Sequence, residues 1–365
     1  MDWPQRPQRT LPLNDLSRCE DRDELSAAIA RVLDSGWFLL GPEGAAFEAE
    51  LAGYVGADQA VALASGTDAL ELAMRAFLPR GGSAVLTAAN AGGYASVAAR
   101  RASLGVSWAD VDESTHCLTA DTVRAALTPE IGLVVVTHLY GRPAAVDEIV
   151  ALCHPLGVAV VEDCAQAIGA FTASGPVGSR ADAATFSFYP TKNLGALGDG
   201  GALTTSDPGV ADRVRKLRQY GWLGKYDIAE SGGANSRLDE LQAAVLRSRL
   251  PKVAGWNRRR REILASYREA AGGRVEVLPV QAGHAAHLAV CVTTERNELR
   301  RHLSALGIAT DVHYPIPDHR QAGLGAGAVK LPVTEILSER VLSVPLFPQL
   351  SDEEVERVAA ALASF

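Results

Sequence analysis

The sequence has few cysteines and none arranged as metal ligands. The five cysteines are scattered along the chain, and no two of them have the spacing of a chelating pair (Cys19, Cys117, Cys153, Cys164 and Cys291). This pattern argues against a zinc site, and we expect no bound metal. An odd, dispersed set of thiols is typical of an intracellular protein whose cysteines stay reduced.

Long apolar runs and basic stripes are also missing. No stretch is long and apolar enough to span a bilayer, and the polar, proline-rich residues 1–15 contain no segment of signal-peptide length. The formal net charge is −8, and the one basic run, Arg258 to Arg261, coincides with apolar residues at helical spacing. That run predicts a solvated helix face rather than a nucleic-acid surface. We expect a cytoplasmic protein that binds neither membrane nor nucleic acid.

The amino-acid composition is typical of a globular protein with a large core. The chain has 365 residues, of which 47% are hydrophobic and 21% charged, enough for one large domain and a smaller second one. Apolar strands alternate with helices: strands are predicted at 60–63, 84–87, 106–110, 132–137, 158–162, 183–188 and 202–205, and helices at 94–104, 120–127, 146–155 and 208–220. This alternation predicts an α/β fold with a mostly parallel sheet covered on both faces.

The predicted domains divide near residue 250. Helices are expected at 239–250 and 251–271, and an α+β pattern follows from residue 274. We therefore predict a large domain over 1–250, which includes an extended arm over residues 1 to about 20, and a small C-terminal domain over 251–365. A dinucleotide-binding dehydrogenase is the usual first guess for such a chain, but no G-x-G-x-x-G follows the first strand.

One lysine lies between an apolar strand and a glycine-rich turn. Phe186-Ser187-Phe188-Tyr189-Pro190 precedes Thr191-Lys192-Asn193-Leu194-Gly195. Lys192 therefore lies in a stretch of mostly apolar or small residues. Desolvation lowers the pKa of an amine, and a neutral amine can bond to a carbonyl carbon. The alternative interpretation is an exposed loop lysine whose ammonium group reaches water.

Two further polar motifs follow predicted strands. Ser65-Gly66-Thr67 turns a strand into a helix, so its backbone N–H groups and hydroxyls could bind a phosphate, or its hydroxyls could simply cap the helix. Asp163 ends an apolar strand, where a buried carboxylate needs a cationic partner unless it caps a helix. Because ligands of parallel sheets bind beyond the carboxyl ends of the strands, we expect these motifs and Lys192 to lie together.

A proline-containing loop near the C-terminus is a candidate substrate wall. It runs from Gly307 through Asp311-Val312-His313-Tyr314-Pro315 to His319. Two histidines and a tyrosine among prolines predict a rigid polar loop, although a solvent-exposed connection is the simpler alternative.

These motifs together resemble the DegT/DnrJ/EryC1/StrS family of pyridoxal phosphate (PLP)-dependent sugar aminotransferases, over nearly the whole chain. The resemblance rests on Glu162-Asp163-Cys164-Ala165-Gln166-Ala167, the segment around Lys192, Asn235-Ser236-Arg237-Leu238-Asp239, and the loop that contains His313-Tyr314-Pro315. It implies PLP-dependent transferase fold type I, the fold of aspartate aminotransferase. Some family members have a histidine in place of the lysine and run a dehydration or deoxygenation, so the presence of Lys192 favours transamination.

The resemblance also implies roles for individual residues. Catalysis would fall to Lys192, which bonds to PLP and carries the proton, and to Asp163, which pairs with the pyridine nitrogen. The other implied cofactor contacts are Ser65, Gly66, Thr67, Gln166, Ser187 and, from the neighbouring subunit of a homodimer, Asn235. The implied substrate contacts are His313, Tyr314, His319 and Arg237.

The segment Thr87 to Ser96 departs from the family pattern, which places an aromatic residue on the cofactor ring. We predict that Tyr94 takes that place, although it could also be a core residue at the start of a helix. The implied activity transfers an amino group from an amino acid, expected to be L-glutamate, to a nucleotide-linked keto-deoxysugar of antibiotic or surface-glycan biosynthesis. The alternatives are a cyclitol aminotransferase of the same family and a non-catalytic PLP-binding regulator.

Overall fold

The computed structural model describes residues 10–18, 21–77, 83–281, 283–325, 327 and 329–365. Its centre is a seven-stranded sheet of order β1-β9-β8-β5-β4-β2-β3. The strands are β1 (Gln59–Leu63), β2 (Ala84–Ala88), β3 (Gly105–Ala109), β4 (Ile131–Thr137), β5 (Ala159–Asp163), β8 (Ala183–Ser187) and β9 (Gly201–Thr205). Only β9 runs against its neighbours. The predicted mostly parallel sheet is confirmed.

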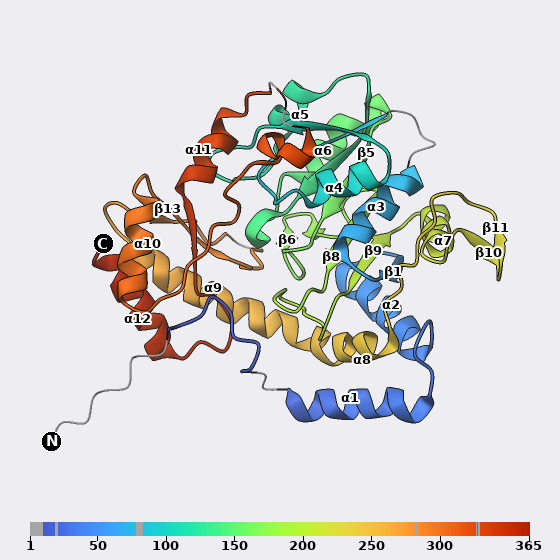
Figure 1. Cartoon of the computed structure of the whole chain (residues 1–365), viewed down its shortest axis with the longest axis horizontal. Coiled ribbons are helices and arrows are strands. Elements are labelled where there is room, and N and C mark those ends of the chain that lie inside the picture. Colours follow the sequence, from blue (N-terminus) through green and yellow to red (C-terminus); the bar gives the residue numbers. More distant parts are fainter. Residues whose placement is uncertain (1–9, 19–20, 78–82, 282, 326, 328) are drawn as a thin grey trace.

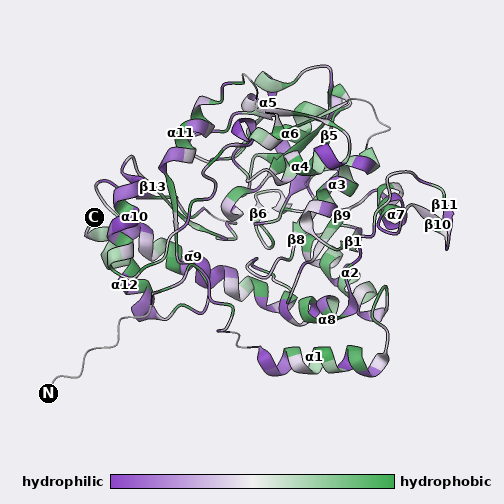
Figure 2. Cartoon of the chain, in the orientation of Figure 1, coloured by the Kyte–Doolittle hydropathy of each residue, from purple (hydrophilic) through white to green (hydrophobic). Residues whose placement is uncertain are grey.

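Helices cover both faces of this sheet, as Figure 1 shows. Successive residues of a strand point to opposite faces, and in β1 Val61 and Leu63 join one buried cluster while Ala60 and Ala62 join another. The first cluster packs under α3 (Gly66–Phe77), α4 (Tyr94–Arg101) and α7 (Pro208–Leu217); the opposite face is covered by α2 (Pro42–Val55), α8 (Glu240–Arg249), α5 (Ala120–Ala126) and α6 (Val146–Cys153). Figure 2 shows the sheet strands as largely hydrophobic.

A second, smaller sheet lies in the C-terminal part of the chain. It is antiparallel, with β13 (Ala289–Val292) between β12 (Glu276–Val277) and β14 (Val341–Val344). The helices here are α9 (Val253–Ala270), α10 (Arg296–Ala305), α11 (Pro332–Arg340) and α12 (Asp352–Ala363). Neither α11 nor β14 was predicted from the sequence. Where the chain divides into domains stays a prediction.

The segment before the first helix is not a free arm where the structure describes it. Leu11 is buried among residues of the C-terminal part, and its N–H donates to the Gly307 carbonyl at 2.8 Å. Residues 1–9 of the predicted arm lie outside the described residues. Helix α1 (Arg22–Ser35) follows and packs on α8.

Short elements complete the fold. They are the hairpins β6 (Phe171–Thr172) with β7 (Gly175–Pro176) and β10 (Trp222–Gly224) with β11 (Asp227–Ile228), and one-turn helices at Leu139–Gly141, His154–Leu156, Leu250–Lys252, Asp318–Arg320 and Ala322–Leu324. The turn at Leu250–Lys252 joins α8 to α9, which extend from the large sheet to the small one (Figure 1). Among the helices of the described ranges, none combines the length and the apolar character that crossing a membrane requires.

Candidate active site

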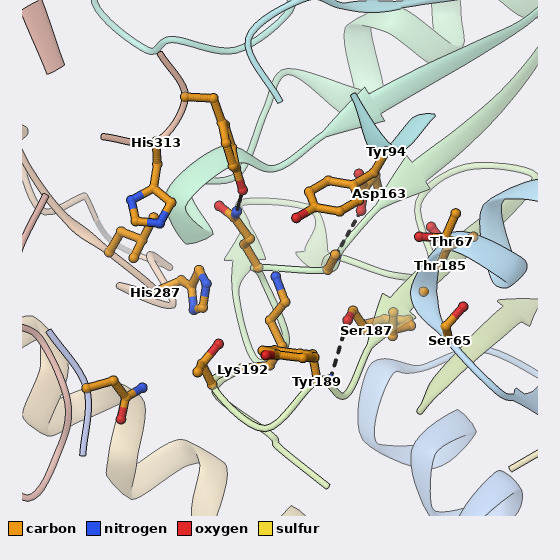
Figure 3. Close-up of a pocket in the computed structure, with 18 of the residues that line it drawn as sticks. Ser65, Thr67, Tyr94, Asp163, Thr185, Ser187, Tyr189, Lys192, His287 and His313 are labelled. Carbon is orange, nitrogen blue, oxygen red and sulfur yellow. Dashed lines mark hydrogen bonds between the residues drawn. The ribbon is translucent and has the colours of Figure 1, made fainter. Parts of the chain in front are cut away.

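The carboxyl ends of three strands border one cavity of about 760 Å³. Ser65 follows β1, Asp163 ends β5, and Lys192 follows β8, and all three line this cavity (Figure 3). These strands run in the same direction, so their carboxyl ends meet at one edge of the sheet. The three motifs therefore lie together, as the strand pattern predicts.

Lys192 is half-buried in this cavity. Burial lowers the pKa of its amine from 10.5 to about 8, and the negative charge of Asp163 acts in the opposite direction. Burial has the larger effect because the ammonium form loses hydration when protein atoms surround it. Near pH 8 a large fraction of the amine is therefore neutral and able to act as a nucleophile.

Asp163 is 5% exposed. One carboxylate oxygen accepts the Ala165 N–H at 3.0 Å, and the other accepts the Thr137 hydroxyl at 3.3 Å. Burial raises the pKa of the carboxyl group, while the Ala165 N–H and the charge of Lys192 lower it. In the described part of the chain no cationic side chain forms an ion pair with Asp163. A buried carboxylate that has no ion-pair partner in the protein is suited to a cationic ligand.

The turn after β1 packs tightly against the end of β8. A Cβ atom on Gly66 would lie 2.7 Å from the Cβ of Ser187, so only glycine allows the two segments to approach this closely. Ser65, Gly66, Thr67 and Ser187 all line the cavity. Ser65 also caps α3, because its hydroxyl accepts the Asp68 N–H at 3.1 Å. The first turn of α3 thus presents N–H groups and hydroxyls to the cavity, an arrangement that suits a phosphate.

Gln166 connects two tyrosines at the cavity wall. Its side-chain oxygen accepts the Tyr140 N–H at 2.6 Å, and its amide nitrogen donates to the Tyr314 hydroxyl at 3.1 Å. The Tyr314 ring in turn packs edge-on against Tyr94, with ring centroids 6.4 Å apart. Tyr94 is half-exposed and lines the cavity. Its predicted position beside the cofactor stays a prediction.

His313 and Tyr314 line the same cavity, but His319 does not. The His319 side chain is fully buried, and its Nε2 lies 3.0 Å from a carboxylate oxygen of Glu335. A ring without solvent access cannot contact a substrate. The structure therefore contradicts the prediction for His319, whose place in this loop is structural.

Asn235 and Arg237 lie outside the cavity formed by their own chain. Asn235 is exposed and pairs with Gln219 in an isolated bridge. Arg237 is half-buried, and its Nε has no hydrogen-bond partner among the described residues. Their predicted roles in cofactor and substrate binding stay predictions.

Several cavity residues were not predicted from the sequence. They are contributed by the first described residues, by the loop after Lys192 and by the C-terminal part of the chain (Leu13, Asn14, Asp199 and His287). His287 had a detectable signal, because it is a polar residue in the otherwise apolar segment before β13. The N-terminal residues had none, since contacts with residues far away in the sequence set their position. These include the bridge between Leu11 and Ile308 and the hydrogen bond from the Leu346 N–H to the Leu13 carbonyl at 3.3 Å.

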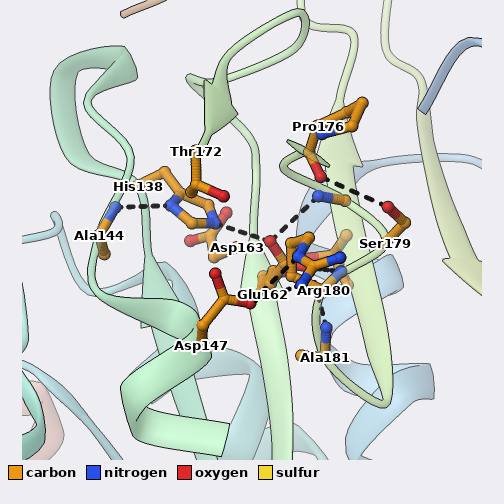
Figure 4. A network of polar contacts seen from close by, with 12 residues as sticks. His138, Ala144, Asp147, Glu162, Asp163, Thr172, Pro176, Ser179, Arg180 and Ala181 are labelled. Carbon is orange, nitrogen blue, oxygen red and sulfur yellow. Dashed lines mark hydrogen bonds and ion pairs between the residues drawn. The ribbon is translucent and has the colours of Figure 1, made fainter. Parts of the chain in front are cut away.

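A buried hydrogen-bond network surrounds Glu162, the neighbour of Asp163 on β5. Glu162 points to the opposite face of β5 from Asp163, and its carboxylate accepts the N–H groups of Gly178, Arg180 and Ala181 (Figure 4). His138 Nδ1 accepts the Ala144 N–H, so its Nε2 carries the proton that bonds to Glu162 at 3.0 Å. His138, Glu162 and Cys164 lie close enough together to be compared with a metal site. The network already occupies both ring nitrogens of His138 and both carboxylate oxygens of Glu162 with hydrogen bonds.

The residues at the cavity match the chemical groups of pyridoxal phosphate. The aldehyde needs a neutral amine, the pyridine nitrogen needs a carboxylate that lacks another cation, and the phosphate needs N–H donors such as those at a helix N-terminus. Lys192, Asp163 and the turn at Ser65 provide these groups. Together with the sheet order, they define the class of the protein as a PLP-dependent enzyme of fold type I.

Comparisons with known proteins agree with this class and specify the family. The model of the DegT/DnrJ/EryC1/StrS aminotransferase family matches residues 19–363. The crystal structure of S. venezuelae DesV in complex with a ketimine intermediate superposes with a TM-score of 0.92 at 40% identity, covering 98% of each chain. The chain belongs to the DegT/DnrJ/EryC1/StrS family of PLP-dependent sugar aminotransferases.

Two relatives are similar to this chain over nearly their whole length. The erythromycin biosynthesis sensory transduction protein EryC1 of Saccharopolyspora erythraea is 41% identical over 96% of this chain and 98% of its own. The dTDP-3-amino-3,4,6-trideoxy-alpha-D-glucose transaminase of Streptomyces venezuelae is 42% identical over 96% of this chain and 95% of its own.

Proposed function

We propose that the protein transfers an amino group from L-glutamate to a dTDP-linked 3-keto or 4-keto deoxysugar. The similarity to the Streptomyces venezuelae transaminase supports this substrate class. The single observation that carries the proposal is that Lys192 and Asp163 line one cavity at the strand ends.

PLP, when bound, supplies an aldehyde carbon that takes up the amino group and a ring that accepts an electron pair. Lys192 would hold the cofactor through its amine. Burial lowers the pKa of that amine to about 8, so the same group would be able to accept and return a proton at the substrate carbon. A base with this pKa works near neutral pH, because it can both gain and lose a proton there.

Asp163 acts as a fixed negative charge. The Thr137 hydroxyl and the Ala165 N–H hold its carboxylate in place and leave it without a cationic side chain. It can therefore keep the pyridine nitrogen protonated. The first turn of α3 and Ser187 hold the phosphate, and Gln166, bonded to Tyr140 and Tyr314, holds the wall beside the ring.

The substrates carry more negative charge than this chain's cavity can neutralise. Among the described residues that line it, Lys192 is the only lysine or arginine, and Asp199 and Asp311 add negative charge. The carboxylates of the donor and the diphosphate of the sugar nucleotide need cations. We therefore propose a homodimer with shared active sites, in which Asn235 and Arg237 serve the neighbouring subunit. A cytoplasmic location stays a prediction.

A panel of nucleotide-linked 3-keto and 4-keto sugars, with glutamate as donor, tests the proposal. The mass of the product should increase by the replacement of a carbonyl oxygen with an amino group for at least one dTDP-sugar. An inosose in the same panel tests the cyclitol alternative. Amination of the inosose without amination of any nucleotide sugar would contradict the proposed substrate class.

A further inference from the structure

His287 lies in the cavity wall beside Lys192 (Figure 3). It precedes β13, belongs to none of the sequence motifs above, and is only 7% exposed. Its position raises the question of which ring nitrogen faces the cavity and whether that nitrogen carries a proton. The surrounding hydrogen bonds answer both parts.

Two asparagines fix the proton on the ring. The Asn257 amide nitrogen donates to the Ile168 carbonyl at 2.9 Å, so its oxygen accepts from the Asn193 amide nitrogen at 2.7 Å. The Asn193 nitrogen also donates to the Ala285 carbonyl at 2.8 Å. The Asn193 oxygen therefore lies 2.9 Å from Nδ1 of His287. Because an amide oxygen only accepts, Nδ1 of His287 must carry the proton.

The opposite nitrogen, Nε2, is then the free one. It has no hydrogen-bond partner in the described part of the chain, and it is not among the buried unbonded atoms. Since the ring is otherwise enclosed, this nitrogen reaches the cavity. Burial, followed by the positive charges of Lys192, Arg260 and His313, holds the pKa of His287 well below 6.5. The ring is therefore neutral, with a lone pair at Nε2.

We propose that Nε2 of His287 is a fixed hydrogen-bond acceptor for a hydroxyl on the sugar carbon next to the reacting carbonyl. The proposal rests on the proposed function and adds a specificity residue to it. Figure 3 shows His287 beside Lys192 in the cavity wall. Because the proposed function places Lys192 at the reacting carbon, the same proposal places the neighbouring sugar carbon and its hydroxyl at His287. The weak basicity of the ring suits recognition of a hydroxyl better than removal of a proton.

The protonation state can be measured without any sugar. ¹⁵N-histidine labelling of the holoenzyme and long-range ¹H–¹⁵N NMR distinguish a protonated Nδ1 from a protonated Nε2, and the His287→Gln variant assigns the signal by its loss. We expect the proton on Nδ1 in the wild type and a mixture of both forms in Asn193→Leu. A proton on Nε2 in the wild type overturns the proposal. This measurement holds whether or not a nucleotide sugar is the substrate.

The recognition step is tested with three sugars within each protein. One is a dTDP-ketosugar that the enzyme aminates, and the other two lack the hydroxyl on one or the other carbon next to the carbonyl. In the wild type, kcat/KM should fall about tenfold for one of the deoxy sugars, the usual effect of one hydrogen bond. In His287→Leu the two values should agree within about twofold. Because the ratio is taken within one protein, partial misfolding of a variant does not change it.

Two controls complete the experiment. His154→Leu removes a half-exposed histidine outside the cavity, and should keep the tenfold preference. His287→Gln retains an acceptor oxygen and should restore part of it. Equal kcat/KM values for all three sugars in the wild type, or an unchanged preference in His287→Leu, overturn the proposal. If the wild type aminates no nucleotide sugar, the proposed function fails, and the NMR result alone then decides the state of His287.

Discussion

Asp163 and Lys192 face the same cavity from the ends of two strands that pair directly, β5 and β8. Burial disfavours the charge on each of them, and each charge stabilises the other. The carboxylate of Asp163 and the amine of Lys192 can therefore each bind a different part of one ligand in this cavity.

Replacement of Lys192 by alanine should abolish transamination, because no other lysine lines the cavity in the described part of the chain. We expect kcat to fall by at least about 10³-fold, within the range for loss of a positioned acid–base group. The variant should still bind the pyridoxamine form of the cofactor, as measured by its absorbance after gel filtration. Lys192→Arg is the matched control, and it should be as inactive because arginine stays protonated. Full activity in Lys192→Ala would contradict the assignment.

Asp163→Asn should keep the fold and lose most of the activity. The amide has the shape of the carboxylate but no charge, so it cannot hold the pyridine nitrogen protonated. We expect kcat to fall by about 10²-fold or more, the effect of removing one fixed electrostatic partner. Thermal unfolding of the apoprotein should not show a loss of stability, since burial already disfavours the charged form. Unchanged kcat would count against the role of Asp163.

Gly66→Ala should weaken cofactor binding. The added Cβ would lie 2.7 Å from the Cβ of Ser187 and 3.1 Å from its Cα, so the turn must move away from β8. We expect at least a tenfold higher Kd for PLP, measured by titration of the apoprotein. Gly53→Ala in α2 is the control, because its Cβ would meet nothing within 4 Å. That change should leave the Kd unaltered and stabilise the helix by up to about 1 kcal/mol.

Reconstitution of the apoprotein with PLP should depend on pH with a midpoint near 8. Burial lowers the pKa of Lys192 to about 8, so the neutral amine increases with pH below this value and is fully formed above it. The rate of covalent attachment, followed by visible absorbance, should rise about tenfold per pH unit below pH 7 and level off above pH 9. A rate that continues to rise to pH 10.5 would show a solvated lysine.

Local patterns were enough to predict the main parts of the site. Asp163 and Lys192 could be predicted because each follows an apolar strand, and the ends of parallel strands meet at one edge. His319 could not be assigned correctly, because a loop sequence does not show which side chains point inward; the Glu335 contact that buries it comes from α11.

Long-range contacts account for what was missed. The tautomer of His287 depends on Asn193 and Asn257, which lie far away in the sequence and show no periodic pattern. Strand β14 is only four residues long and follows α11 without a turn, so no break in the sequence marks it. The fold class was predictable because it depends on many repeated elements, whereas these features depend on single contacts.

The bond between Lys192 and the cofactor is the most direct test of the whole account. Sodium borohydride reduces the linkage between an amine and the aldehyde carbon, and peptide mass mapping then locates the attached group. We predict that the purified holoenzyme loses its visible absorbance at the original wavelength and carries one phosphopyridoxyl group on the peptide that contains Lys192. Attachment to a different lysine, or no attachment after incubation with PLP, would contradict the account.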